Sequence, residues 1–168
     1  ITKSNSGTLN GSLTFSGFAE LIGGKDSDFF KLPAGTFITE GIFGGSGSDQ
    51  LSMMGEFTTP PDWMLTNQES GTFSNGHGFG NSFPGQKFSG FELLTSASPS
   101  TVTGPISGGT WKIMDNNTVT FDGLTLKGVS TIKGNVGPDL FELKAETPTS
   151  ITILGGDGND TLTNHSMP

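Results

Sequence analysis

Two glycine–aspartate strings in this chain each recur after 21 residues, and no other feature restricts the possible folds as strongly. "IGGKDSDFFKL" is followed by "IFGGSGSDQL", and further along "KGNVGPDLFEL" is followed by "ILGGDGNDTL". Gly23 and Gly44 are 21 residues apart, and Gly134 and Gly155 are separated by the same interval. Two independent pairs with one spacing indicate a repeating structural unit rather than a chance match.

The residues beside these strings alternate as β-strands do. Phe30 and Leu32 are two residues apart and face one side of a strand, and so do Phe141 and Leu143. A repeat of about 20 residues, with alternating apolar residues beside a Gly-Asp turn, is typical of one coil of a β-solenoid. We therefore predict an all-β fold, a parallel β-helix (β-solenoid) with coils of about 21 residues and with glycine and aspartate at its corners.

A second recurring string, Phe-x-Gly-apolar, sets the domain organisation. It occurs as "TFSGFAELIGG", "KFSGFELLTS" and "TFDGLTLKGV", and each copy follows a Gly-Thr segment. We predict a single β-solenoid domain over residues 1–168, made of degenerate repeats at about 6–57, 70–100 and 107–164. The less regular stretch at 54–86, which holds a Pro-Pro pair and many glycines, is predicted to be an irregular insertion.

Aromatic residues supply the predicted core. Phe15, Phe88 and Phe121 occupy the same place in the three copies of Phe-x-Gly. Because like residues stack into ladders inside a solenoid, we expect all three to be buried. Trp63 in the insertion is the best candidate among the aromatic residues for contact with a sugar or partner, but burial in the core is the interpretation we favour for it too.

The string "GGDGNDTL" matches the nonapeptide G-G-x-G-x-D-x-apolar-x, which binds Ca²⁺ in parallel β-rolls. A 21-residue coil would stack Asp28 near Asp49 and Asp139 near Asp160, so that each pair could offer hard oxygen ligands to one ion. The candidate calcium ligands are Asp28, Asp49, Asp139, Asp160, Asp26 and Asp157. A second interpretation stays open, in which these residues cap structural corners without metal, because tandem nonapeptides form coils of about 18 residues.

Charge and composition argue against several classes of partner. All eight basic residues are lysine and the net charge is −8, so the clustered positive charge that nucleic acids and anionic membrane surfaces attract is missing. There is no cysteine, and no apolar run approaches the ~20 residues that span a bilayer. We predict no nucleic-acid partner and no membrane insertion. An acidic chain without cysteine is typical of an extracellular bacterial protein.

The tripeptide Gly-His-Gly around His77 resembles one element of the polygalacturonase active site, which also lies on a parallel β-helix. Those enzymes require further carboxylates and a basic segment beside the histidine, and this chain has no arginine. It also contains no G-x-S-x-G nucleophile elbow, and no helix is expected after its glycine clusters to complete a phosphate-binding loop. We predict no enzymatic activity, no catalytic residues and no cofactor other than the candidate Ca²⁺.

The strings "TFSGFAELIGGKDSDFFKL" and "TFDGLTLKGVSTIKGNVGPDLFEL" resemble the repeats of filamentous-haemagglutinin-like exoproteins and other large bacterial adhesins. The final string, "ILGGDGNDTL", is similar to the nonapeptide of RTX proteins, although the chain lacks the tandem nonapeptides of an RTX array. The resemblance implies a right-handed parallel β-helix, secretion to the extracellular space or the bacterial cell surface, and an adhesive or matrix-structural role.

We therefore predict a non-enzymatic structural or adhesive segment of a bacterial extracellular or cell-surface protein. Its expected partners are other copies of itself, in a homo-oligomer or an end-to-end filament, or further repeats of a longer chain. The chain begins at Ile1 without a Met or a signal segment, so we expect a processed product or a piece of a longer protein. The alternatives are a module that binds a glycan, host surface or partner through residues 63–86, and a calcium-binding RTX-like domain.

Overall fold

The structure, a computed structural model, describes residues 6–9, 13–55, 61–74, 85–114, 117–144 and 150–165. These residues form strands and turns, without a helix, so the all-β prediction is confirmed for them. They accordingly include no helix that is long and apolar enough to cross a membrane. The strands are β1 Ser6–Leu9, β2 Leu13–Ser16, β3 Glu20–Ile22, β4 Phe29–Pro33, β5 Gly41–Phe43, β6 Gln50–Met54, β7 Asp62–Leu65, β8 Ser70–Ser74, β9 Gln86–Ser89, β10 Leu93–Thr103, β11 Gly109–Ile113, β12 Thr118–Phe121, β13 Leu124–Lys133, β14 Asp139–Leu143, β15 Thr152–Leu154 and β16 Thr161–Asn164.

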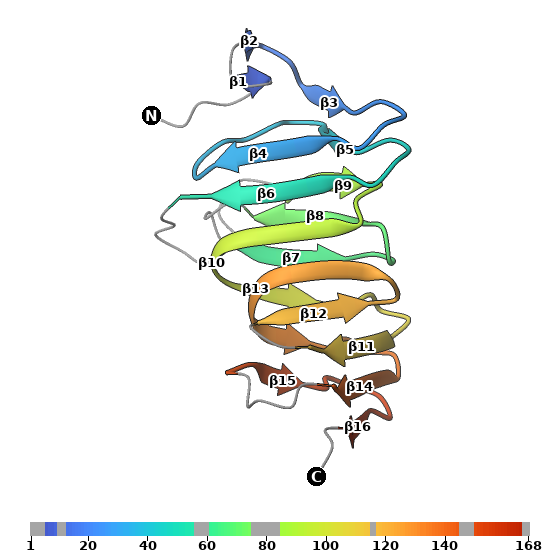
Figure 1. Ribbon diagram of the computed structural model, residues 1–168. Coiled ribbons are helices and arrows are strands. Elements are labelled where there is room, and N and C mark those ends of the chain that lie inside the picture. The colour runs from blue at the N-terminus through green and yellow to red at the C-terminus, as the bar shows by residue number, and fades with distance from the viewer. Residues whose placement is uncertain are drawn as a thin grey trace.

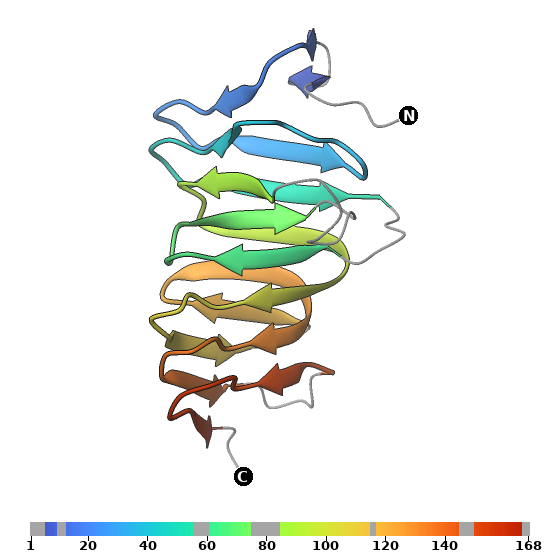
Figure 2. The ribbon, with the colours of Figure 1, turned by 180° about the vertical axis from the view of Figure 1, so that it is seen from behind.

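Fourteen strands belong to one mostly parallel sheet that is folded into two faces (Figures 1 and 2). The front face, seen in Figure 1, holds β4, β6, the first half of β10, the first half of β13, β12, β11, β14 and β16 in spatial order. The rear face, seen in Figure 2, holds β3, β5, β9, β8, β7, the second halves of β10 and β13, and β15. β10 and β13 bend from one face to the other, and β1 and β2 form a separate antiparallel hairpin.

At both ends of this stack, neighbouring parallel strands are offset by 21 residues. β3 pairs with β5 and β4 with β6 in this register, as Leu21↔Ile42 and Phe30↔Leu51. β13 pairs with β15 and β14 with β16 in the same register. The recurring strings of the sequence are therefore corners that join a rear-face strand to a front-face strand. We call each such unit an arch: β3–β4, β5–β6, the second half of β13 with β14, and β15–β16.

In the middle of the stack, antiparallel strands enlarge the interval between parallel neighbours. β8 lies antiparallel between β7 and β9 on the rear face, and β12 lies antiparallel between β11 and β13 on the front face. The described part of residues 54–86 thus contributes strands to the same sheet. Alternation of apolar and polar residues is the same in a parallel and an antiparallel strand, so it does not distinguish these hairpins from the arches.

The core lies between the two faces and is rich in aromatic rings. Phe88 and Phe121 are buried, as predicted, with 2% and 1% of their surface exposed. Phe15 is only partly buried, and it packs against the edge of the core. The indole of Trp111 lies 4.5 Å from the ring of Phe121 and is stacked 6.3 Å from that of Phe141, measured between centroids. Such ring contacts add stability beyond the burial of their area.

Trp63 belongs to this core, as the favoured of its two interpretations predicted, and the alternative contact with a sugar or partner is excluded by its burial. Its side chain is 1% exposed and packs against Phe73 and Phe88, with centroid distances of 5.4 and 5.7 Å. Because β7 alternates inward and outward, Trp63 points into the core while its neighbour Met64 faces solvent.

Glycine is required at the start of three corners, at Gly23, Gly44 and Gly134, because the next corner leaves no room for a side chain there. A Cβ on Gly23 would overlap the carbonyl oxygen of Gly44, and a Cβ on Gly134 would overlap the carbonyl oxygen of Gly155. Close packing of backbone against backbone thus sets the distance between arches, and only a residue without a side chain permits it.

We expect Gly134→Ala to lower the free energy of unfolding by about 3 kcal/mol, because the new methyl group collides with a backbone oxygen that cannot move without separating two strands. Gly24→Ala is the matched control, since a Cβ there would come no closer than 3.8 Å to the Asp28 carboxylate. Its effect should stay within about 0.5 kcal/mol. Thermal and urea unfolding of both variants measure the difference, and equal stabilities would contradict this account of the corners.

Candidate functional site

One edge of the stack collects the corners (Figure 1, right-hand edge). We call it the corner edge. The acidic residues that lie in these corners are Asp26, Asp28, Asp49, Glu92, Asp157 and Asp160. Backbone hydrogen bonds join successive corners along it, such as Gly23 N–H to Phe43 O and Gly134 N–H to Leu154 O. The corners are residues 23–28, 44–49, 90–92, 104–108, 134–138 and 155–160.

Carboxylates link the first three corners in a single direction. The backbone N–H of Asp28 donates to Asp49 Oδ1 at 2.7 Å, and the N–H of Asp49 donates to Glu92 Oε2 at 2.6 Å. Each acid therefore satisfies the backbone donor of the acid one corner earlier. Hydrogen bonds to a charged acceptor are stronger than those between neutral groups, so this ladder fastens successive corners together.

The same arrangement recurs at the opposite end of the corner edge. The N–H of Asp139 donates to Asp160 Oδ1 at 3.0 Å, and the indole N–H of Trp111 donates to Asp139 Oδ1 at 3.0 Å. The side chain of Asp139 is 2% exposed, and its carboxyl group accepts hydrogen bonds from an indole N–H and from a backbone N–H. We call the two sets of contacts the carboxylate ladder.

In Asp28 and in Asp139, the second carboxylate oxygen closes the acid's own corner. Asp28 Oδ2 accepts the N–H of Gly24 at 2.6 Å, and Asp139 Oδ2 accepts the N–H of Asn135 at 3.3 Å. This oxygen also lies against the first glycine of the corner, only 2.6 Å from where a Cβ of Gly23 or Gly134 would stand. The spacing Gly-x-x-x-x-Asp follows from this contact, because the carboxylate takes the space that a side chain on the glycine would need.

Asp49 departs from the pattern in one respect. Its side chain is 1% exposed, and its Oδ2 is buried without a hydrogen-bond partner among the described residues. A buried acceptor that lacks a donor costs free energy, so the middle corner of the first ladder is held less favourably than its neighbours.

The structure brings together two pairs of the predicted calcium ligands. Asp28 lies beside Asp49, and Asp139 lies beside Asp160, as the 21-residue interval led us to expect. Asp26 and Asp157 are exposed on the corner edge. Among the described residues, no three acidic or histidine side chains converge as metal ligands would, whereas Ca²⁺ takes six to eight oxygens. Calcium binding by these residues stays a prediction.

Sequence reasoning missed two members of the ladder. Glu92 lies in a corner of three residues. Its longer side chain accepts the backbone N–H of the preceding corner, as an aspartate does in a corner of six residues. The string "SGFE" around Glu92 was assigned to the Phe-x-Gly repeat, which hid this role. The hydrogen bond from Trp111 to Asp139 joins residues 28 positions apart, and no local sequence pattern predicts it.

Two open grooves lie next to each other on the corner edge. The first, of about 350 Å³, runs between the turn at residues 66–69 and residues 105–108. The second, of about 390 Å³, shares Ser107 and Gly108 with it and extends to Asn159. Trp63 is buried, whereas the 66–69 turn presents polar groups to the first groove. The glycan- or partner-binding role of residues 63–86 stays a prediction.

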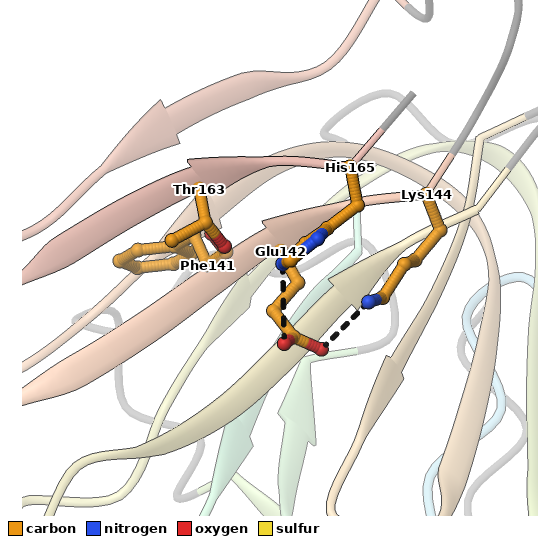
Figure 3. Close-up of polar contacts among 5 residues, drawn as sticks. All are labelled: Phe141, Glu142, Lys144, Thr163 and His165. Atoms are coloured by element: carbon orange, nitrogen blue, oxygen red, sulfur yellow. Dashed lines mark hydrogen bonds and ion pairs between the residues drawn. The ribbon is translucent and has the colours of Figure 1, made fainter. Parts of the chain in front are cut away.

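A small charged cluster lies near the β15–β16 end of the front face (Figure 3). Glu142 Oε2 is 3.4 Å from Lys144 Nζ, and Glu142 Oε1 is 3.7 Å from His165 Nε2, which forms an ion pair only when the imidazole is protonated. The exposed position of His165 limits the energetic weight of the contact. His77, the other histidine, lies outside the described residues.

Asp62 on β7 has a perturbed ionisation. Burial raises the pKa of Asp62, and a hydrogen bond with Thr101 and the charge of Lys133 partly oppose this rise. The folded chain therefore holds a proton at Asp62 more readily than the unfolded chain does. Its contribution to stability is present at acidic pH and is lost as the pH rises through the folded-state pKa.

No protein-family model, curated protein or solved structure matches this chain.

We expect Asp139→Ala to lower the free energy of unfolding by about 3 kcal/mol, because it strips the buried indole N–H of Trp111 and the N–H of Asn135 of their acceptor. Asp157→Ala is the control, since this exposed corner residue should change stability by less than about 0.5 kcal/mol. Urea unfolding followed by tryptophan fluorescence measures both. A loss in Asp139→Ala no larger than in the control would contradict the structural role of the ladder.

The two interpretations of the aspartates differ in their response to calcium. If the carboxylates act as caps for backbone N–H groups, millimolar Ca²⁺ should shift the melting temperature by no more than about 1 °C relative to Mg²⁺ or chelator, since a ligand stabilises only the state it binds. Differential scanning calorimetry with each addition measures this. A rise of several degrees that is specific to Ca²⁺, and that is lost in Asp160→Asn, would establish a metal site instead.

Proposed function

We propose that this chain is a structural or adhesive segment of a bacterial extracellular or cell-surface protein, without enzymatic activity. We further propose that it is a right-handed parallel β-helix that joins end to end with other units of its kind. The observation that carries this proposal is the 21-residue register, which recurs on both faces and at both ends of the stack.

The chain path supports the proposed β-helix. β3 and β5 are parallel neighbours on the rear face, and the segment that connects them contributes β4 to the front face. β13 and β15 are related in the same way through β14. Connections between parallel strands of one sheet are right-handed in about 98% of known cases, which supports the proposed hand.

The use of the polar groups supports a structural role. The buried carboxylates of Asp49 and Asp139 are committed to backbone N–H groups and to an indole. These contacts hold successive corners together. The composition, acidic and free of cysteine, supports an extracellular location.

The ends of the stack support self-association. Among the described residues, β3 and β4 at one end and β15 and β16 at the other each have a parallel partner on one side only. A strand edge with unpaired N–H and C=O groups is a template for another strand. Contacts that join one end of a molecule to the other end of the next generate open filaments when the rotation does not close.

We expect the purified chain to form rods whose length increases with protein concentration, because each added copy pairs four free strand edges, two from each end. Sedimentation velocity over a hundredfold range of concentration, with electron microscopy of the same samples, measures this. Monodisperse short particles at the highest concentration would overturn the proposed end-to-end assembly.

A further inference from the structure

We propose that copies of this chain join head to tail in one register, with β15 of one copy beside β3 of the next and β16 beside β4. This inference rests on the proposed end-to-end assembly and assigns its interface. The four strands involved are those with a free edge among the described residues at the two ends of the sheet. The β1–β2 hairpin lies beyond β3 at the same end of the stack (Figures 1 and 2), but it pairs with none of the four strands, so their backbone edges have no strand partner there.

The two end arches have matching dimensions. In β3–β4, the strand ends at Ile22, directly before the corner at residues 23–28, and β4 begins at the next residue. In β15–β16, the strand ends at Leu154, directly before the corner at residues 155–160, and β16 begins at the next residue. One arch placed on the other therefore repeats the stacking already present within the chain, where the β13–β14 arch lies on β15–β16.

The carboxylate ladder has a direction, and each end of the chain presents one half of its next step. No carboxylate of the described residues accepts the N–H of Asp160, and no described donor binds Oδ1 of Asp28. In the proposed register, Asp160 N–H of one copy meets Asp28 Oδ1 of the next, as Asp139 N–H meets Asp160 Oδ1 within one copy. The ladder then continues from copy to copy without a change of geometry.

The space beside Gly155, at the β15–β16 end, fits the same neighbouring copy. A Cβ on Gly23, Gly44 or Gly134 would overlap a carbonyl oxygen of the next corner. A Cβ on Gly155 would contact only the side chain of its own corner residue, Asp160, because no described corner follows. The Gly23 carbonyl of a second copy would fill the place that the Gly155 carbonyl fills against Gly134.

Apolar residues at the two ends also correspond. Leu162 is 60% exposed, although its neighbour in the register, Phe141, is 2% exposed. The proposed register places Leu162 on the partly buried Phe30 of the next copy and so extends the apolar row inside the stack. On the outer surface of the rear face it pairs Leu154, 48% exposed, with Ile22, 66% exposed. Burial of this apolar surface favours association.

The test uses one variant for each end. Leu162→Asp disables the β15–β16 end, and Ile22→Asp disables the β3–β4 end, because either joint would bury an unpaired charge. Both side chains are more than half exposed in the single chain, so each variant should keep the melting temperature of the dilute wild type. Each alone is expected to be monomeric, with a dissociation constant for self-association raised roughly 100-fold or more.

An equimolar mixture of the two variants should form a heterodimer that grows no further, since it contains one intact pair of ends. Ile106→Asp is the matched control: Ile106 is 76% exposed but lies on the corner edge away from both ends, so this variant should assemble as the wild type does. Sedimentation velocity of each variant and of the mixture gives the particle sizes. If either variant fails to fold, Phe29→Asp and Leu154→Asp replace Ile22→Asp and Leu162→Asp.

The outcomes separate the register from the assembly itself. Dimers of Ile22→Asp alone would show a symmetric contact between two β15–β16 ends, and this would overturn the head-to-tail register. Filaments of both single variants would overturn the interface while leaving end-to-end assembly intact. A wild-type chain that stays monomeric at all concentrations would overturn both, as when the free edges receive only other repeats of a longer chain.

Discussion

A corner in a stack of β-strands leaves backbone N–H groups that point along the stack, where no strand receives them. Buried donors of this kind must be satisfied, because an unpaired one costs about as much as a lost hydrogen bond. Here the acid of the following corner accepts them: Asp49 for Asp28, Glu92 for Asp49, and Asp160 for Asp139. This contact requires successive corners to lie close together, and the glycine at the start of an aspartate corner leaves room for both the carboxylate of its own corner and the carbonyl of the next.

The sequence was most informative where the chain repeats itself. The 21-residue interval predicted which strands become parallel neighbours at the ends, and it placed Asp139 beside Asp160. It gave no indication that β8 and β12 run antiparallel, since side-chain alternation carries no information on strand direction. Trp63 is buried because it packs against Phe73 and Phe88, and no spacing rule in the sequence connects these segments.

The aspartates illustrate why the candidate site was harder to predict than the fold. A calcium turn and a corner that caps backbone N–H groups both need a carboxylate folded back over a glycine-rich turn. The same residues at the same spacing serve either purpose, so the pattern alone does not separate them. The difference lies in what faces the oxygens: in this structure Asp139 faces an indole and a backbone N–H.

The antiparallel insertions are matched between the two faces. Between the regular arches, the rear face gains β7 and β8, and the front face gains the first half of β13 and β12. Each face therefore gains two strands, and the two strands of the final arch lie at the same height along the stack, as those of the first arch do. An insertion on one face alone would make that face longer than the other, so the two strands of the final arch would no longer lie at the same height. A protein of this kind can therefore gain or lose strands only in equal numbers on the two faces if both strands of each end arch are to stay at the same height.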